Sequence, residues 1–368
     1  MLLNDYSMQY EIISFYKYVP LSEPEEIRDH LKIICKNLNL LGRILISKEG
    51  INGAVSGSKS DIEKFKHELK TNLLFSDLTF REQEADYKTH HKLVVKLRKE
   101  ICAFDEKVDL QNKGKHLPPK ELKKWYDNNE EFYIVDARND YEYKVGKFKG
   151  AIELPIKNFR EFPQGVEVLE PLKDKKVVLY CTGGVRCEKA SAYMKDKGFR
   201  NVYQIEGGII NYVNSIPENK EWEGGLFVFD DRLVSDLSNP ITECKHCKKE
   251  CSKYVNCHNL DCDKLTVMCE ECQKTMNKTC SQECKEAKRQ RKETAAKKVI
   301  GIVENYYPKA GAALIKVNEP IQKNSTISIA GKTTKEFTQA VEEVRYDEDN
   351  LITIAVIHKV RKNDKVLA

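Results

Sequence analysis

The stretch KVVLYCTGGVRCEK, residues 176–189, decides how the centre of this chain folds. The apolar run before Cys181 is typical of a buried strand, and the segment from Arg186 to Gly198 is typical of a helix that ends at glycine. The two glycines between them let the backbone curl with its N–H groups inward, and the helix end and Arg186 add positive charge. We therefore predict that Cys181 is a reactive cysteine with a depressed pKa. The alternative is a structural cysteine buried beside a turn.

Upstream segments repeat this alternation of helix and strand. The sequence PPKELKKWYDNN (118–129) predicts a helix with proline in its first turn, and FYIVDAR (132–138) predicts a second buried strand. Apolar strands that alternate with helices indicate a parallel sheet covered on both faces. Such sheets bind ligands at the carboxyl ends of their strands, which is where Cys181 is expected.

The first 105 residues show a different pattern of short strands and two amphipathic helices. Strands are expected at 9–18, 42–48, 51–57, 76–82 and 92–98, and helices after the capping boxes Ser22–Glu25 and Ser60–Glu63. The first six of these elements have the order β-α-β-β-α-β of a ferredoxin-like α+β sandwich, and the strand at 92–98 follows them. Because that architecture serves many functions, it predicts an accessory domain and no particular chemistry.

Cysteine dominates the segment from 244 to 284, which holds nine of the 13 cysteines of the chain. Eight of them form closely spaced pairs, namely Cys244 and Cys247, Cys257 and Cys262, Cys269 and Cys272, and Cys280 and Cys284. Two such pairs can hold one tetrahedral Zn²⁺, so we predict two structural zinc ions. Sequential and cross-braced pairing both fit the spacing, and Cys251, His246 and His258 are left over.

A basic stretch, KEAKRQRKETAAKK (285–298), follows the cysteines. Its candidate phosphate contacts for RNA are Lys288, Arg289, Arg291 and Lys292. A second basic concentration is KTHHKLVVKLRK (88–99), and for both stretches the alternative is an ordinary solvated surface or linker. Beyond 299, short β-rich runs punctuated by Gly, Pro, Asn and Asp predict a small antiparallel β-barrel.

Composition limits the kind of protein this is. The 368 residues suffice for several domains, and the formal net charge is +5. The start of the chain lacks the pattern of a signal peptide, and no apolar run approaches the roughly 20 residues that span a bilayer. We therefore expect a cytoplasmic protein without membrane contact, in which cysteines serve as ligands or catalytic thiols and not as disulfides.

The loop and the upstream sequence VDARNDYEYKVGKFKGAIELP (135–155) resemble a rhodanese domain. Cys181 and Arg186 match the ends of the rhodanese loop, and only four residues separate them. Related phosphatases need five, so a tetrahedral phosphate would fit poorly. Asp136 and Arg138 match the rhodanese D-x-R element, which implies either a brace for the loop or an ordinary ion pair at a strand end.

A narrower resemblance covers about residues 9–284. CTGGVRCEK, together with GRILISKEGINGAVSG (42–57), GGLFVFDDR (224–232) and the cysteine cluster, resembles the rhodanese-like tRNA uridine(34) hydroxylase family. The resemblance implies oxygen-dependent conversion of the wobble uridine to 5-hydroxyuridine on a tRNA anticodon stem-loop, with O₂ as co-substrate. It places Cys181 at the catalytic position and Gly183, Gly184, Arg186, Cys187 and Glu188 around it. No flavin or nicotinamide fingerprint is found in the sequence.

The tail resembles the small barrel of translation-factor domain II and the C-terminal barrel of collagenase-like peptidase-family proteins. That resemblance implies an RNA-binding domain that contacts the translation machinery, and the alternative is a packing domain. The expected organisation is ferredoxin-like (1–105), rhodanese-like (106–235), zinc module (236–284), basic linker (285–298) and barrel (299–368). Two other functions stay open, a persulfide sulfurtransferase that thiolates tRNA and a non-catalytic RNA-binding scaffold. Cys187 would either resolve an oxidised Cys181 or be a structural residue at the helix start.

Overall fold

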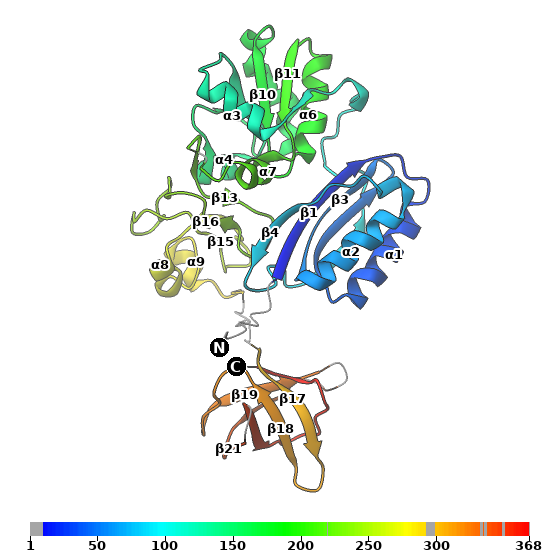
Figure 1. Cartoon of the computed structure of the whole chain (residues 1–368). Helices are drawn as coiled ribbons and strands as arrows, with labels where there is room; N and C mark the ends of the chain where they lie inside the picture. The colour runs from blue at the N-terminus through cyan, green and yellow to red at the C-terminus, as the bar shows by residue number, and fades with distance from the viewer. Residues whose placement is uncertain are drawn as a thin grey trace. The chain divides into compact units, whose positions relative to one another are not determined.

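The computed structural model describes residues 10–218, 220–291, 299–331, 334, 337–347 and 350–367 (Figure 1). The chain divides into two compact units, Met1–Gln290 and Arg291–Ala368. Within the described ranges, no helix has both the length and the apolar character needed to cross a membrane.

The N-terminal domain is a five-stranded sheet in the order β4-β1-β3-β2-β5 with two helices on one face (Figure 1). Its elements are β1 (Tyr10–Tyr18), α1 (Pro24–Asn37), β2 (Leu41–Ser47), β3 (Gly50–Ser58), α2 (Lys59–Thr71), β4 (Arg81–Ala85) and β5 (Leu93–Leu97). The predicted ferredoxin-like sandwich is confirmed, with β5 added parallel to β2 at the edge. Alternate residues of β1 face opposite sides of the sheet, so Ile13 and Phe15 pack in the core under the helices, while Ile12 and Ser14 face away from it.

Three local predictions in this domain were wrong. Helix α1 begins at Pro24 without a side-chain cap from Ser22, because proline in the first turn already fixes the helical φ angle. Helix α2 is capped by Ser58, whose Oγ accepts a hydrogen bond from the Asp61 amide at 3.2 Å, and not by Ser60. The strand expected at 76–82 is mostly a turn, from which Phe75 and Leu78 reach the core.

The central domain contains a five-stranded sheet in the order β6-β11-β10-β7-β9, and all of its strand pairs are parallel, as predicted. Its strands are β6 (Lys115–Leu117), β7 (Tyr133–Asp136), β9 (Ile152–Glu153), β10 (Lys176–Tyr180) and β11 (Asn201–Ile205). The main helices are α3 (Pro119–Asp127), α4 (Asp140–Val145), α6 (Val185–Asp196) and α7 (Gly208–Ser215). In β10, Val177 and Leu179 belong to one core cluster and Val178 and Tyr180 to another, so both faces of the sheet are covered.

The cysteine-rich segment folds around the hairpin β15 (Tyr254–Asn256) and β16 (Leu265–Val267), followed by α8 (Glu270–Thr275) and α9 (Gln282–Glu286). The basic linker was expected to begin at residue 285, but that residue still belongs to α9. Ser281 caps this helix, which continues past the last cysteine, and the Leu260 amide then bonds to the Arg289 carbonyl at 2.9 Å. Residues 285–290 therefore pack on the cysteine-rich segment.

The second unit is a seven-stranded antiparallel sheet in the order β20-β19-β23-β17-β18-β22-β21 (Figure 1). Its strands are β17 (Val299–Tyr307), β18 (Ala312–Val317), β19 (Thr326–Ala330), β20 (Phe337–Ala340), β21 (Arg345–Tyr346), β22 (Leu351–Ala355) and β23 (Lys365–Leu367). The predicted barrel is a half-barrel among the strands described, because the edge strands β20 and β21 do not pair with each other. Gln339 in β20 instead donates a side-chain hydrogen bond to the Ala355 carbonyl at 2.8 Å.

Candidate active site

Cys181 is the first residue after β10, at the carboxyl ends of the parallel strands. The chain then turns through Gly184, whose φ of +98° is left-handed, into α6. A Cβ at Gly184 would lie 2.9 Å from the hydroxyl of Tyr16, so both the conformation and the space require glycine there. Gly183 has open space around it and no positive φ, so the structure gives no steric reason for glycine at that position.

The loop stabilises a negative charge on Cys181. The Gly184 amide donates to its Sγ at 3.1 Å. Burial by itself raises the pKa of Cys181, but the Cys187 thiol, the Arg186 guanidinium and the amides of Arg186 and Cys187 together lower it to about 5. The thiolate is therefore the dominant form of Cys181 at neutral pH.

Arg186 is held by a glutamate that the sequence analysis missed. Its two terminal nitrogens donate to the carboxylate oxygens of Glu142 in α4 at 2.6 and 2.8 Å, and the Glu142 side chain is fully buried. Burial alone would raise the pKa of Glu142, but Arg186 lowers it below its ordinary value. The Asn139 amide donates to the same carboxylate at 3.1 Å. The capping-box spacing from Asn139 to Glu142 was thus the available signal.

Glu142→Gln is expected to lower the free energy of unfolding by about 3–5 kcal/mol, because it leaves the buried Arg186 without its counter-charge. Lys144→Gln in the same helix removes only an exposed pair with Asp140 and should cost less than about 1 kcal/mol. Tryptophan fluorescence during urea denaturation measures both, since Trp125 and Trp222 are the two tryptophans of the chain and both lie in the core of the central domain. Equal losses in the two variants would contradict this role of Glu142.

Asp136 and Arg138 form a second buried pair, in which Arg138 Nη2 lies 2.6 Å from an Asp136 oxygen. Arg138 also donates to the Gly146 carbonyl at 2.6 Å, and its guanidinium lies over the rings of Tyr180 and Trp222. These contacts hold the end of the sheet and do not include the loop. For Asp136 and Arg138, these contacts favour an ordinary ion pair at a strand end over a role as a brace for the Cys181 loop.

Glu188 and Lys189, which follow the loop in α6, connect the central domain to the N-terminal domain. Glu188 accepts a hydrogen bond from Tyr16 Oη of β1 at 2.8 Å and pairs with Lys113 at 2.7 Å. Burial opposes ionisation, yet His116 and Lys113 lower the pKa of Glu188 to about 2. The next residue, Lys189, is also buried and pairs with Glu100 at 2.7 Å. The first turn of α6 is therefore fixed from both domains.

A cavity of about 710 Å³ lies between the helix-free face of the N-terminal sheet and the Cys181 loop. The sheet contributes Ile12, Ser14, Arg43, Leu45, Asn52 and Ala54, and the segment 227–233 closes another side. His90, His91 and Lys92 of the basic stretch 88–99 also line it, which the sequence did not reveal. Cys181 lines the cavity but has no exposed surface, so neighbouring side chains must shift before a ligand can reach the sulfur.

The charge state of Cys181 can be measured in the absence of RNA. The difference in ultraviolet thiolate absorbance between the wild-type protein and Cys181→Ser should be full at pH 7 and disappear as the pH falls through about 5. An ordinary thiol would lose this signal near pH 8.5, with its unperturbed pKa. Because the folded pKa is depressed, the shift stabilises the fold fully above about pH 8.5 and ceases to do so as the pH falls through the folded value. A midpoint near 8.5 would contradict the assignment of a thiolate.

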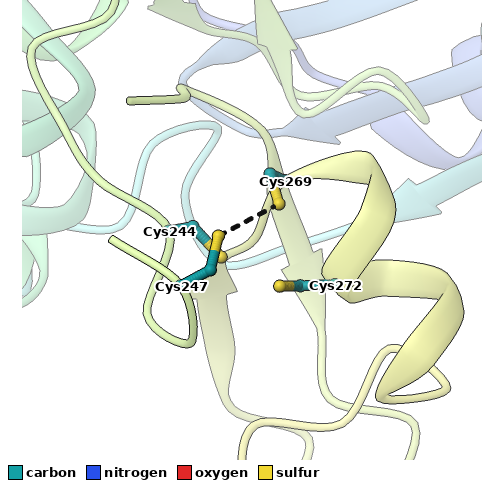
Figure 2. A group of neighbouring side chains, drawn as sticks. All are labelled: Cys244, Cys247, Cys269 and Cys272. Atoms are coloured by element: carbon teal, nitrogen blue, oxygen red, sulfur yellow. Dashed lines mark hydrogen bonds between the residues drawn. The ribbon is translucent and has the colours of Figure 1, made fainter. Parts of the chain in front are cut away.

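The eight paired cysteines form two clusters. The sulfurs of Cys244, Cys247, Cys269 and Cys272 lie within 4.8 Å of one another, and so do those of Cys257, Cys262, Cys280 and Cys284. Figure 2 shows the four side chains of the first cluster gathered together. The pairing is therefore cross-braced, because the β15–β16 hairpin brings the first pair beside the third. Cys251 is buried near the first cluster but outside it, and burial raises its pKa to about 11.

Two of the residues predicted to contact RNA, Lys288 and Arg289, lie in the same unit as the cavity but do not line it. Lys288 is exposed, and Arg289 forms an ion pair with Asp261. Arg291 is exposed, whereas Lys292 lies outside the described residues.

Three family models match the chain in series. The UPF0176 acylphosphatase like domain matches residues 10–101, the Rhodanese-like domain matches 118–215, and the Rhodanase C-terminal model matches 223–285. These matches cover the N-terminal sandwich, the parallel-sheet domain and the cysteine-rich segment.

Solved structures give weak likenesses. The C-terminal domain of a putative U32 peptidase from Geobacillus thermoleovorans is 18% identical, covering 19% of this chain and 99% of that chain, with a TM-score of 0.18. The Rhodanese-like domain of the Alr3790 protein from Anabaena is 24% identical, covering 30% of this chain and 78% of that chain, with a TM-score of 0.26.

Curated relatives match over much greater lengths. The tRNA uridine(34) hydroxylase of Chlamydia felis is 41% identical over 292 residues, which are 76% of this chain and 88% of the relative. The protein of the same name from Cytophaga hutchinsonii is 39% identical over 283 residues, which are 75% of this chain and 90% of the relative. With these identities and coverages, together with the loop around Cys181, the chain belongs to the tRNA uridine(34) hydroxylase family.

Proposed function

We propose that this protein hydroxylates C5 of uridine 34 in tRNA with molecular oxygen, using Cys181 as the nucleophile. The observation that carries the proposal is the loop that lowers the pKa of Cys181 to about 5 at the edge of a cavity large enough for a nucleotide. The names of the relatives supply the substrate and the reaction class. The substrate is an anticodon stem-loop, whose unpaired bases can be turned out into a pocket.

Uracil by itself reacts poorly with oxygen, and addition of the thiolate makes its C5 more reactive. A bond from Cys181 Sγ to C6 opens the C5–C6 double bond and leaves an electron pair on C5 as an enolate. C5 then bonds to O₂. The terminal oxygen takes up a proton from solvent to give a hydroperoxide, and two electrons and two protons from a thiol-class reductant then cleave its O–O bond, so that water leaves and one oxygen stays on C5 as hydroxyl. Loss of the C5 proton and of the C6–S bond restores the ring and frees Cys181.

Cys187 serves this loop chiefly as a structural residue. It is fully buried in the core cluster with Ala190 and Met194, and its thiol donates a hydrogen bond to Cys181 Sγ. Burial and the neighbouring Cys181 raise the pKa of Cys187, so it stays protonated and supports the adjacent thiolate. A disulfide with an oxidised Cys181 is the second role that this contact allows.

The two cysteine clusters hold structural zinc in this proposal. Four sulfurs at mutual distances within 4.8 Å suit the tetrahedral thiolate sites that Zn²⁺ favours. Zinc bound there would tie the hairpin β15–β16 to the helices α8 and α9. The clusters hold the segment in place beside the central domain, where the Tyr254 hydroxyl donates to the Tyr141 carbonyl at 3.0 Å.

RNA binding draws on several basic segments in this proposal. The phosphates would be contacted by Lys288, Arg289, Arg291 and Lys292. Arg289 would give up its ion pair with Asp261 and pair with a phosphate of the RNA. Arg43 and Lys92, both exposed and lining the cavity, would contact phosphates beside the target nucleotide. The half-barrel would add contacts to RNA or to the translation machinery, in the cytoplasm.

Nucleoside mass spectrometry tests this function directly. The tRNA from cells that express the protein in air should contain 5-hydroxyuridine or its derivatives at position 34, and this product should be absent without oxygen or without the protein. The Rhodanese-like match keeps a persulfide sulfurtransferase as the second candidate. A product heavier by sulfur and not by oxygen would favour that candidate, and unmodified tRNA in all samples would contradict both.

A further inference from the structure

The cavity contains one aromatic side chain that stays largely exposed although it packs edge-on against Phe227, with ring centres 5.4 Å apart. Of the three aromatic residues that line it, Phe159 and Phe227 are buried, whereas Phe229 is 57% exposed. The Phe229 ring lies over the guanidinium of Arg186, with its centre 5.6 Å from Cζ. An exposed phenylalanine in a cavity lined with cations offers a flat apolar face next to the Cys181 loop.

The same cavity contains a buried imidazole that lacks a partner on one side. His90 is 8% exposed, and its Nδ1 lies 3.0 Å from Ser56 Oγ. Its Nε2 is buried and, among the residues that the structure describes, has no hydrogen-bond partner. A buried polar atom without a partner is costly, and His90 lines the cavity, so a ligand in the cavity can supply the missing partner once the side chains that cover Nε2 shift.

These two side chains are close enough in the fold to act on one ligand. Phe229 is two residues before Asp231, whose amide donates to the carbonyl of Thr89, the neighbour of His90, at 2.8 Å. Asp231 also accepts from His91 Nδ1 at 2.7 Å. The chain segment that carries Phe229 is therefore fastened beside His90, while the Phe229 ring touches Arg186 of the reactive loop.

We propose that Phe229 and His90 form the nucleobase subsite, in which the uracil ring stacks on Phe229 and its edge hydrogen-bonds to His90 Nε2. This inference rests on the proposed function, since it names the residues that present the base to Cys181. Uracil has both an N3–H donor and carbonyl acceptors, so either tautomer of His90 finds a partner on it. Burial lowers the pKa of His90, and the ring that meets the base is neutral.

The stacking contact is tested by a binding cycle on an anticodon stem-loop RNA with either uridine or an abasic site at position 34. The wild-type protein should bind the uridine RNA about 10- to 100-fold more tightly than the abasic RNA, as expected for one base on one aromatic ring. Phe229→Ala should reduce this preference to the part that the hydrogen bond to His90 contributes, whereas Phe229→Tyr should keep the full preference. Tyr87→Ala removes an aromatic residue that is 56% exposed outside the cavity lining and is expected to change neither affinity.

His90 is tested by a pair of amides. His90→Asn keeps a polar atom near the Nδ1 position for Ser56 and loses Nε2, so it should weaken binding of the uridine RNA about 5- to 10-fold and leave the abasic RNA unaffected. His90→Gln places an amide near the Nε2 position and should restore most of the loss. His67→Asn, at an exposed histidine outside the cavity lining, is the control.

The two proposals fail in different ways. If Phe229→Ala still prefers uridine over the abasic site by the wild-type factor, the subsite is wrong, even where the wild-type protein hydroxylates tRNA. If His90→Asn and His90→Gln weaken binding of the uridine RNA and of the abasic RNA by the same factor, His90 has only a structural role. If the binding preference falls in Phe229→Ala as expected but no hydroxylated product forms in the wild type, the subsite stands and the proposed reaction is wrong.

Discussion

Cys181→Ser is expected to abolish hydroxylation of uridine 34 while the variant still binds tRNA. Serine keeps the size and the hydrogen bonds of the loop, but its hydroxyl is not ionised at neutral pH, whereas the wild-type thiol has a pKa of about 5. The loss should exceed about 10³-fold in single-turnover rate, because the nucleophile itself is removed. Mass spectrometry of the tRNA product and a binding isotherm on the same preparation separate catalysis from binding.

A trapping experiment examines the covalent step by itself. A tRNA with 5-fluorouridine at position 34 should form an adduct with the wild-type protein that survives denaturation, because the final loss of a proton from C5 is blocked by fluorine. The adduct should be absent from Cys181→Ser. Normal hydroxylation by Cys181→Ser would eliminate every mechanism that uses this thiol, and failure to trap the wild-type protein would contradict addition to C6.

Cys187→Ser is the matched variant for the adjacent thiol. It removes a hydrogen-bond donor to Cys181 Sγ but not the Arg186 charge or the loop amides, so activity should fall less than in Cys181→Ser. A loss as complete as that of Cys181→Ser, with tRNA binding intact, would assign Cys187 a chemical role as the second thiol.

Removal of metal is expected to unfold the cysteine-rich segment 244–284. Small cysteine-rich modules derive most of their folding free energy from the metal, about 10–16 kcal/mol for a structural Zn²⁺. Protein purified without chelators should contain two zinc ions per chain, one for each four-sulfur cluster. After chelation, proteolysis should cut this segment, while the fluorescence of Trp125 and Trp222 in the central domain should be preserved.

Single substitutions assign each ion to its cluster. Cys272→Ser should lose the ion of the first cluster and Cys262→Ser that of the second, because three remaining thiolates bind zinc more weakly than four. Cys251→Ser is the matched control, since Cys251 is buried beside the first cluster and is not one of its four members. A zinc content near zero in the wild-type protein, or the loss of an ion in Cys251→Ser, would contradict the cross-braced assignment.

Sequence periodicity identified the elements of this fold more reliably than their ends. The run KVVLY became β10 because a strand buried on both faces must be apolar throughout, whatever its neighbours are. The start of α2 was missed because Ser58 and Ser60 are equally good caps by residue type, and only the chain path into the helix selects Ser58. In the same way, Phe75 and Leu78 have the alternation of a strand but reach the core from a turn.

The sequence by itself determined the features that depend on neighbours along the chain. The loop from Cys181 to Arg186 and the spacing within each cysteine pair belong to this class, because local backbone geometry decides them. Only the tertiary structure decided that Glu142 holds Arg186, that the first cysteine pair joins the third, and that His90 and Phe229 share a cavity with Cys181. Each of these contacts joins segments that are far apart in the sequence. Whether such segments meet depends on how the sheets and helices pack, and the spacing of residues along the chain does not predict that packing.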